Sequence, residues 1–194
     1  MERVIEANIN TPEVWDAHYQ TPEGLRNTSW NCHSAVTVLS AVLPPNAHVL
    51  DCACGTAFGP LRVSERRPDL VWSGCDFSQQ VVARNRASGF PWHRMFQADL
   101  TRIEEFVPSR QYDVIAACEV LEHLEDPASV AQSVARLATR QAIITVPYRN
   151  RVPTMYHLWS IDEPDLRVWL EPFGRVETYI VRFGTKLIAV CDKR

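Results

Sequence analysis

Three aspartates follow short apolar runs, and their spacing suggests that they share a ligand. Asp51 ends the run HVLD and precedes the small-residue loop CACGTAFG, Asp76 lies in GCDFS, and Asp99 lies in ADL. A single aspartate after a strand is more often a turn or helix cap than a ligand-binding group. Three in order at successive strand ends predict a nucleoside pocket, because carboxylates accept hydrogen bonds from ribose hydroxyls and from an exocyclic amine.

The loop after Asp51 has the composition of a ligand-binding turn. Small residues let the backbone approach a ligand closely, and the free N–H groups of a following helix favour an anionic group. The pattern GxGxxG fits this loop in no register, which argues against a nicotinamide dinucleotide. Cys52 and Cys54 have no partner at zinc-binding spacing, so we expect both to pack on one buried face.

The elements that must position these residues alternate between β-type and helical patterns, as in a parallel sheet with helices on both faces. The β-type runs span residues 48–53, 71–77, 92–100, 112–119 and 141–147. Two further runs near the end are separated by a short turn at 183–185 and must pair antiparallel. We therefore expect a doubly wound α/β fold with a mostly parallel seven-stranded sheet and an antiparallel last strand. A single domain over 1–194 is predicted, with a helical lid at 1–45 and the core at 46–194.

Helix starts can be recognised from capping residues. Ser78 is expected to cap one helix, and Asp126 with Pro127 supplies the start of another. Ser160 with Glu163 predicts a capping box for a third.

Composition limits the class of protein. The chain has 194 residues, 46% of them hydrophobic, and a net charge of −3, which is typical of a globular protein and disfavours a nucleic-acid partner. No apolar run reaches the ~20 residues that cross a bilayer, and the N-terminus has no signal-peptide pattern. We expect a cytoplasmic protein without a membrane partner, and reduced thiols at its six cysteines.

Four segments together resemble the successive motifs of class I S-adenosylmethionine-dependent methyltransferases. They are Val49–Thr56, Gly74–Ser78, Ala98–Leu100 and Tyr112–Leu124. The resemblance implies S-adenosyl-L-methionine as the cofactor, with its ribose on Asp76 and its adenine edge on Asp99. The cofactor-binding residues that it implies are Tyr19, Asp51, Ala53, Gly55, Asp76, Phe77, Asp99, Leu100, Cys118 and Glu119.

The loop departs from the DxGxGxG pattern of that superfamily. Ala53 and Ala57 replace two of the three glycines, and Gly55 is retained. Because alanine is tolerated at negative φ, we expect a slightly bulkier loop that still binds the cofactor.

The segment CEVLEHL after the fourth β-type run leaves two alternatives for the methyl acceptor. Glu119, Glu122 and His123 form ExxEH, a spacing that can place oxygen and nitrogen ligands on one side of a turn. It resembles the metal-binding segment of RNA 3′-end 2′-O-methyltransferases, in which a later histidine, here His157, would complete the site. It equally resembles small-molecule methyltransferases that bind no metal. The negative net charge favours the second alternative.

The catalytic candidates follow from that choice. His123, Tyr148 and His157 are expected to orient or deprotonate an oxygen or nitrogen of a small-molecule acceptor. Arg149 and Arg151, near Tyr148, suggest that this acceptor is acidic. A third alternative is a domain that binds the cofactor without catalysing transfer.

Overall fold

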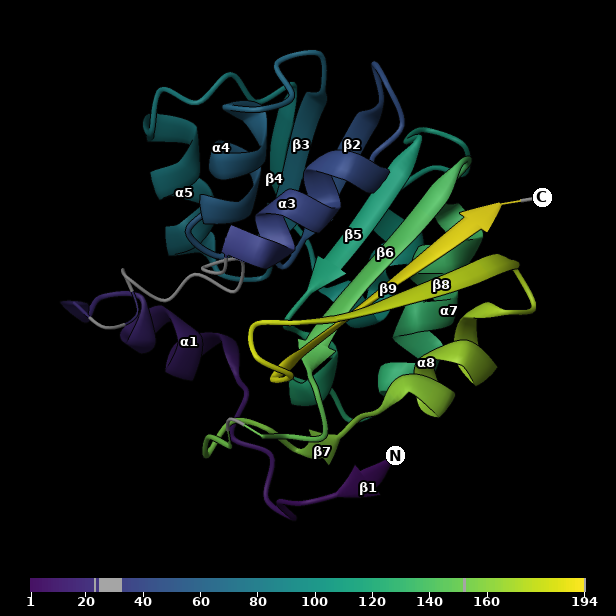
Figure 1. Cartoon of the computed structure of the whole chain (residues 1–194). Coiled ribbons are helices and arrows are strands. Elements are labelled where there is room, and N and C mark those ends of the chain that lie inside the picture. The colour runs from purple at the N-terminus through teal and green to yellow at the C-terminus, as the bar shows by residue number, and fades with distance from the viewer. Residues whose placement is uncertain (23, 25–32, 152, 194) are drawn as a thin grey trace.

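The structure, a computed structural model, describes residues 1–22, 24, 33–151 and 153–193. Its centre is a seven-stranded sheet in the order β4-β3-β2-β5-β6-β9-β8 (Figure 1). β2 to β6 are parallel, and β9 pairs antiparallel with both β6 and β8. The strands are β2 His48–Cys52, β3 Val71–Asp76, β4 Arg94–Gln97, β5 Val114–Cys118, β6 Gln141–Pro147, β8 Gly174–Val181 and β9 Lys186–Lys193. The predicted fold class is confirmed.

The strand order places a crevice at the carboxyl ends of β2 and β5. From β2 the chain adds β3 and β4 on one side and then crosses over to add β5 and β6 on the other. Ligands of such sheets bind where the order reverses, because the connections leave the strand ends in opposite directions and open a gap. The loops after β2 and β5 therefore face the same crevice.

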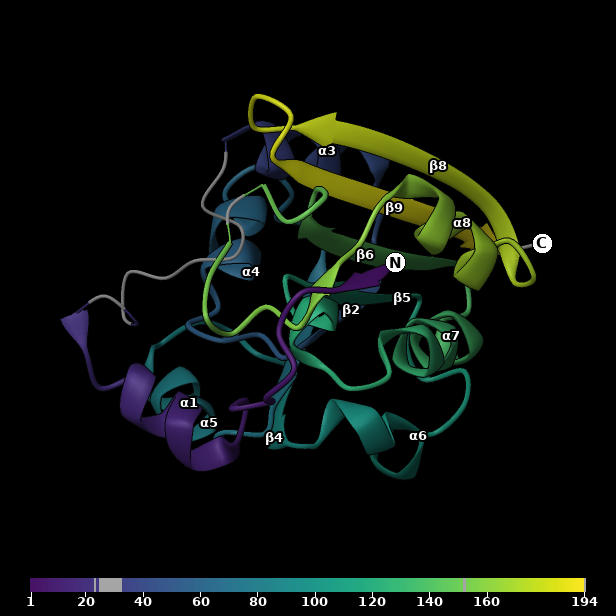
Figure 2. The same ribbon diagram turned by 90° about the horizontal axis from the view of Figure 1, so that it is seen from below.

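Helices cover both faces of the sheet, as Figures 1 and 2 show. Alternation along β2 supplies both cores: Val49 packs with Leu39 and Trp72 on one face, whereas Leu50 packs with Leu121 on the other. On the first face lie α3 His33–Val42, α4 Phe58–Ser64 and α5 Gln79–Ala87, and on the second lie α6 Ile103–Phe106, α7 Pro127–Leu137 and α8 Glu163–Leu170.

Two of the three predicted caps are confirmed. The Val81 amide donates to Ser78 Oγ over 3.1 Å at the start of α5, and the Ser129 amide donates to Asp126 Oδ1 over 3.0 Å at the start of α7. The predicted capping box at Ser160 is wrong. Ser160 belongs to a two-stranded antiparallel ladder between β1 Glu2–Arg3 and β7 Trp159–Ser160, so the chain is still extended there. The box of α8 is formed instead by Asp162 and Asp165.

The N-terminal segment crosses the carboxyl ends of the strands (Figure 2). From the β1–β7 ladder it leads to α1 Pro12–His18, which contacts α5. Asn10 fixes the crossing, because its Nδ2 donates to the Tyr156 carbonyl over 2.9 Å and its Oδ1 accepts from Trp15 Nε1 over 3.2 Å. Of the segment expected as a lid, Asn10, Trp15, His18 and Tyr19 line the crevice, whereas α3 packs on a face of the sheet; residues 23 and 25–32 are outside the description. None of the described helices is long and apolar enough to cross a membrane.

Candidate active site

The loop after β2 has left-handed backbone at three alternate residues, Ala53 (φ 53°), Gly55 (φ 49°) and Ala57 (φ 59°). The expectation of negative φ at the two alanines is therefore wrong. The path is fixed by hydrogen bonds: the Cys54 amide donates to the Cys75 carbonyl over 3.0 Å, and the Gly55 amide donates to an Asp76 oxygen. Left-handed backbone costs a non-glycine residue roughly 1–2 kcal/mol, so the loop stores strain at both alanines.

The two loop cysteines are buried, as expected, but they pack in different clusters. Cys52 lies in the large core beside Cys75, whereas Cys54 packs with Val82 and Met95 near α5. The expectation of one shared face is wrong, because the strand ends at Cys52 and the left-handed Ala53 interrupts the alternation. The described cysteines are free thiols; Cys32 lies outside the described residues.

Asp76 is the most tightly organised acid of the site. It is only 2% exposed, and its two oxygens accept from the amides of Gly55 and Ser78, each over 3.0 Å. Burial raises the pKa of this carboxyl group to about 6, the two amide donors oppose the rise, and the charge of Asp16 adds to it. Each oxygen keeps a second lone pair, so Asp76 can accept further hydrogen bonds from a ligand.

A small cavity of about 90 Å³ brings together the ends of β3 and β4. Its lining includes Tyr19, Ala53, Asp76, Phe77, Asp99 and Leu100. Asp99 caps the short helix Leu100–Arg102 by accepting from Thr101 N over 2.9 Å and from Thr101 Oγ1 over 2.7 Å. Four cofactor residues predicted after these two strands, Asp76, Phe77, Asp99 and Leu100, thus share one cavity.

Asp51 differs from the other two aspartates. It lies beneath the loop and lines neither this cavity nor the larger one described below. Its carboxyl oxygens are buried and accept no hydrogen bond within the described part of the chain. Burial, and secondly the charge of Asp76, raises the pKa of Asp51 well above its ordinary value. A buried polar group without a partner is unfavourable, so Asp51 is suited to a donor or cation that a ligand brings.

Tyr19 follows α1 and lies over the glycine of the loop. Its Oη is 3.0 Å from the place where a Cβ on Gly55 would stand. Burial, followed by the charges of Asp76 and Cys54, raises the pKa of Tyr19 well above its ordinary value. Together with the left-handed φ, this close approach explains why the retained glycine is at residue 55.

A larger cavity of about 460 Å³ adjoins the first. The two share Trp15, Tyr19, Ala53, Glu119 and His123, so they form neighbouring parts of one crevice. The polar or ionisable residues of its floor and wall include Cys118, Glu119, Glu122, His123, His157 and Lys186. Gly55 also lines this larger cavity.

Glu119 stands at the boundary of the two cavities and is held by a buried pair. Its Oε2 is 3.2 Å from Lys186 Nζ, and its Oε1 accepts from Thr145 Oγ1 over 2.8 Å. Lys186 is only 2% exposed, and Glu119 has left-handed backbone (φ 52°). The carboxylate is therefore committed to neighbouring residues, and the pair fixes the turn after β5.

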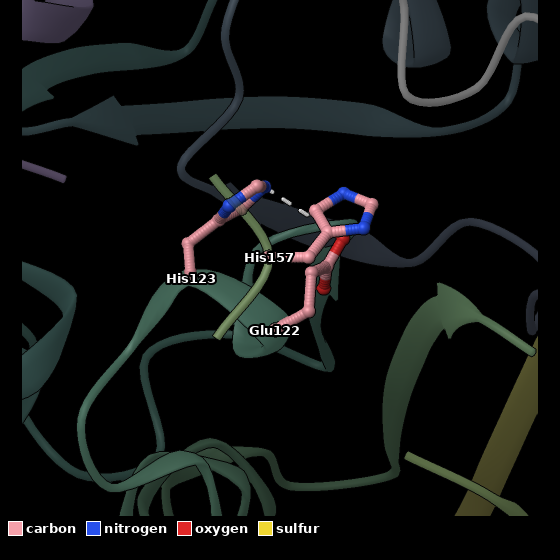
Figure 3. Close-up of side chains that lie close together, drawn as sticks. All are labelled: Glu122, His123 and His157. Atoms are coloured by element: carbon pink, nitrogen blue, oxygen red, sulfur yellow. Dashed lines mark ion pairs between the residues drawn. The ribbon is translucent and has the colours of Figure 1, made fainter. Parts of the chain in front are cut away.

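Glu122, His123 and His157 gather at one side of the larger cavity (Figure 3). One ligand atom from each lies within 4.8 Å of the others, although His157 is 34 residues beyond His123 in the chain. Burial lowers the pKa of His123 to about 3 and that of His157 to about 4. Burial, and secondly the charge of Glu119, raises the pKa of Glu122 well above its ordinary value. Both imidazoles are thus neutral at neutral pH.

Trp15 and Tyr156 supply the aromatic wall of this cluster. The ring centroid of Trp15 is 5.1 Å from that of His123 and 5.2 Å from that of Tyr156. The rings of His123 and His157 are 5.1 Å apart. The wall thus combines α1 with the segment before β7.

Tyr148 is placed differently from the other two catalytic candidates. It lines neither cavity; its ring packs on the core and lies under the guanidinium groups of Arg149 and Arg151, at 5.1 and 5.2 Å. The backbone after β6 continues with a bridge between Tyr148 and Ile161. Among the described residues, Tyr148, Arg149 and Arg151 line neither cavity.

Several residues of the crevice were missed by sequence reasoning, among them Asn10, Arg182 and Lys186. Lys186 had a recognisable signal, because it is one of two lysines in the chain and begins the apolar run KLIAVC. A lysine in a buried strand requires a partner. Asn10 and Arg182 lie outside any periodic pattern and had no comparable signal.

The sheet order and the acids at the strand ends define a Rossmann-like methyltransferase fold. Residues 50–144 match the methyltransferase-domain family, and the strand order is that of the class I S-adenosylmethionine-dependent methyltransferase fold.

Relatives of known name share part of this chain. A ubiquinone biosynthesis O-methyltransferase of Hahella chejuensis is 27% identical over 148 residues, which are 69% of this chain and 61% of that protein. One of Aeromonas salmonicida is 30% identical over 115 residues, 58% of this chain and 48% of that protein. The chain thus spans about half to three fifths of the length of these curated relatives.

Solved structures share the fold over nearly the whole chain. The magnesium protoporphyrin IX methyltransferase of Synechocystis PCC 6803, solved with bound S-adenosylhomocysteine, has a TM-score of 0.66 at 18% identity and covers 96% of each chain. An O-methyltransferase family protein of Burkholderia thailandensis has a TM-score of 0.69 at 15% identity, over 94% of this chain and 59% of that one.

Proposed function

We propose that this chain is an S-adenosylmethionine-dependent methyltransferase that transfers the methyl group to an oxygen of a small-molecule acceptor. One observation carries the proposal: the cavity formed by the strand-end acids opens, across Glu119 and His123, into a larger cavity with neutral histidines. A cofactor and an acceptor bound in adjoining cavities can meet in line, which is the main requirement of methyl transfer.

The residues of the smaller cavity fit the nucleoside part of the cofactor. Asp76 would accept from the ribose hydroxyls with its remaining lone pairs, Phe77 and Leu100 would pack on the adenine, and Asp99 would accept from its amine. Asp51 lines neither cavity, but its buried, unpartnered carboxyl is compatible with the positive groups of the cofactor, because a nearby positive charge favours its ionised form. When bound, the cofactor supplies a methyl group attached to a positively charged sulfur.

The larger cavity fits an acceptor that combines an apolar ring with a hydroxyl. Trp15 and Tyr156 offer aromatic surface, and the unprotonated histidines offer lone pairs to a hydroxyl proton. The bound cofactor would supply the methyl group to the acceptor oxygen, and a ring nitrogen of His123 or His157 would take the hydroxyl proton of the acceptor. Tyr148 is left out of this assignment.

The names of the relatives support a small-molecule acceptor, since they include ubiquinone biosynthesis O-methyltransferases and a porphyrin methyltransferase. The net charge of −3 disfavours RNA. The proposal that the acceptor is acidic is supported by Arg182, which lines the larger cavity, and no longer by Arg149 and Arg151. The cytoplasmic location remains a prediction, which fractionation of the native cells would test.

The test has a binding half and a transfer half. Calorimetry with S-adenosylhomocysteine should detect binding by the wild type and a strong loss in Asp76→Ala. A mass-spectrometric panel of phenols, catechols, carboxylates and a short RNA should give a product 14 Da heavier from a small hydroxyl compound. Cofactor binding without any product would favour a non-catalytic domain, and methylation of the RNA alone would overturn the acceptor class.

A further inference from the structure

The turn between β8 and β9 places a charged side chain at the mouth of the larger cavity. Lys186, the first residue of β9, lies opposite Pro147, the last residue of β6, so the turn at 182–185 lies at the carboxyl-end edge of the parallel strands (Figure 1). From this turn Arg182 lines the larger cavity, whereas the side chain of Phe183 is fully exposed. Burial alone would favour the opposite arrangement, because an exposed aromatic ring forgoes the stabilisation that burial supplies. The path of the turn is therefore set by contacts other than hydrophobic packing.

Two neighbouring segments hold the turn in an unusual conformation. Arg182 (φ 53°) and Phe183 (φ 55°) both have left-handed backbone, which is unfavourable for a residue other than glycine. The Arg182 amide donates to Ser34 Oγ of α3 over 3.2 Å. From the loop after β6, Arg151 Nη1 donates to the Gly184 carbonyl oxygen over 3.0 Å. Strained backbone that is maintained by its surroundings in this way is typical of ligand-binding positions.

Arg182 brings a positive charge that the other residues of the cavity do not balance. Lys186 is matched by Glu119, at 3.2 Å. Burial raises the pKa of Glu122 well above its ordinary value, which favours its uncharged form. Among the residues that the structure describes, no carboxylate lies within ion-pair distance of Arg182. The cavity thus suits a ligand that carries a negative charge.

The geometry of the guanidinium group indicates which anion fits. Its planar fork of N–H groups matches the two oxygens of a carboxylate with two parallel hydrogen bonds. One guanidinium group also balances the single charge of a carboxylate, whereas a phosphate group carries almost twice that charge. A carboxylate is therefore the better match for a single arginine.

From these observations we infer that Arg182 binds a carboxylate of the methyl acceptor, which is a hydroxy acid that is methylated on its hydroxyl group. The inference rests on the proposed function, since it concerns the same cavity. An ionised carboxylate has no proton for the neutral histidines to take, whereas a hydroxyl group has one. The methyl group would be bonded to the hydroxyl oxygen, and the hydroxyl proton would pass to a histidine nitrogen. The carboxylate would hold the acceptor without reacting and would remain free in the product, beside S-adenosylhomocysteine.

The direct test compares acids with their neutral amides in a methylation assay. The probes are 3-hydroxybenzoate and 4-hydroxyphenylacetate beside 3-hydroxybenzamide and 4-hydroxyphenylacetamide, at saturating S-adenosylmethionine. Wild type should have a KM about fivefold lower for each acid than for its amide, which is the upper range of one solvent-exposed ion pair. Addition of 1 M KCl should remove most of this preference by screening.

Variants of Arg182 separate charge from shape. Arg182→Gln should raise the KM for each acid about fivefold and change kcat much less, because the contact is made in the bound substrate and in the transition state alike. Arg182→Lys should restore most of the preference, since it retains the charge. Arg149→Gln is the matched control and should keep the wild-type preference, because Arg149 is exposed in the neighbouring loop and lines neither cavity. Thermal melting and S-adenosylhomocysteine binding show whether each variant is folded.

The product identifies the methylated oxygen. Tandem mass spectrometry should show a methyl ether that survives alkaline hydrolysis. A methyl ester, which alkali cleaves, would overturn the role given to the carboxylate. Calorimetry of the same acids and amides with the S-adenosylhomocysteine complex extends the comparison to compounds that bind without turnover.

Equal constants for acids and amides in wild type, or a preference for acids that persists in Arg182→Gln, overturn the carboxylate site. Methylation of neutral phenols alone overturns the site but leaves the proposed function standing. Absence of S-adenosylhomocysteine binding and of any methylation instead overturns the proposed function.

Discussion

Cofactor affinity should depend on pH through Asp76. In the ligand-free protein burial raises the pKa of Asp76 to about 6. Two ribose hydroxyls would donate to its ionised form and lower that pKa again in the complex. Binding then requires loss of a proton below pH 6, so affinity should fall as the pH falls. If the pKa in the complex returns to about 4, linkage gives a loss of about tenfold between pH 7 and pH 5.

The same shift has an opposite consequence for the stability of the ligand-free protein. Folding raises the pKa of Asp76 from 3.8 to about 6. At a pH below 3.8, protonated Asp76 therefore contributes fully to the stability of the fold. That contribution is lost as the pH rises through 6, and it amounts to about 3 kcal/mol at 1.36 kcal/mol for each pKa unit. Without ligand, Asp76 should therefore weaken the fold at neutral pH while it strengthens cofactor binding.

Calorimetry with S-adenosylhomocysteine at pH 5, 6 and 7, at constant ionic strength, measures the effect. Asp76→Asn should bind more weakly at pH 7 and show a flat profile, because the amide does not titrate. Asp99→Asn is the control and should keep the wild-type slope. A flat wild-type profile, or a wild-type slope that persists in Asp76→Asn, would refute this reasoning.

Three further predictions concern the loop and the buried pair. Gly55→Ala should destabilise the protein by about 1 kcal/mol and weaken S-adenosylhomocysteine binding, because residue 55 has a φ of +49° and the new Cβ would lie 3.0 Å from Tyr19 Oη. Unchanged stability in urea unfolding and unchanged affinity in calorimetry would contradict this prediction. Ala53→Gly should relieve left-handed strain and raise the melting temperature by about 2–4 °C, whereas a lower value would show that the methyl group packs favourably. Lys186→Met should cost about 3 kcal/mol in urea unfolding by leaving Glu119 unpaired, and the added change Glu119→Gln should recover part of that loss.

The sequence predicted the positions of the acids at the strand ends well, for a physical reason. Buried parallel strands must be nearly continuous apolar runs, so their ends could be located, and Asp76 and Asp99 fall where those runs stop. Parallel strands carry their carboxyl ends to the same edge, which brings the acids together without further information. The caps at Ser78 and Asp126 were predictable for the same reason, since each depends on residues within one helical turn.

Predictions failed where the backbone conformation depended on distant contacts. Ala53 and Ala57 adopt left-handed φ because the Cys75 carbonyl and Asp76 hold the loop, a constraint that local preference does not reveal. Ser160 with Glu163 predicts a helix start, but pairing with Glu2 keeps Ser160 extended. In both cases a tertiary hydrogen bond outweighs a propensity of about 1 kcal/mol.

By itself, therefore, the sequence determined the fold class and the acids at the strand ends of the crevice, because both follow from periodic burial and from short-range hydrogen bonds. Only the tertiary structure decided the larger cavity. It brings Trp15, Glu122 and His157 together from segments far apart in the chain, and it turns Glu119 towards Lys186. The loops that carry these side chains have no periodic hydrophobic pattern from which their structure could be predicted. Their positions are set by packing between segments.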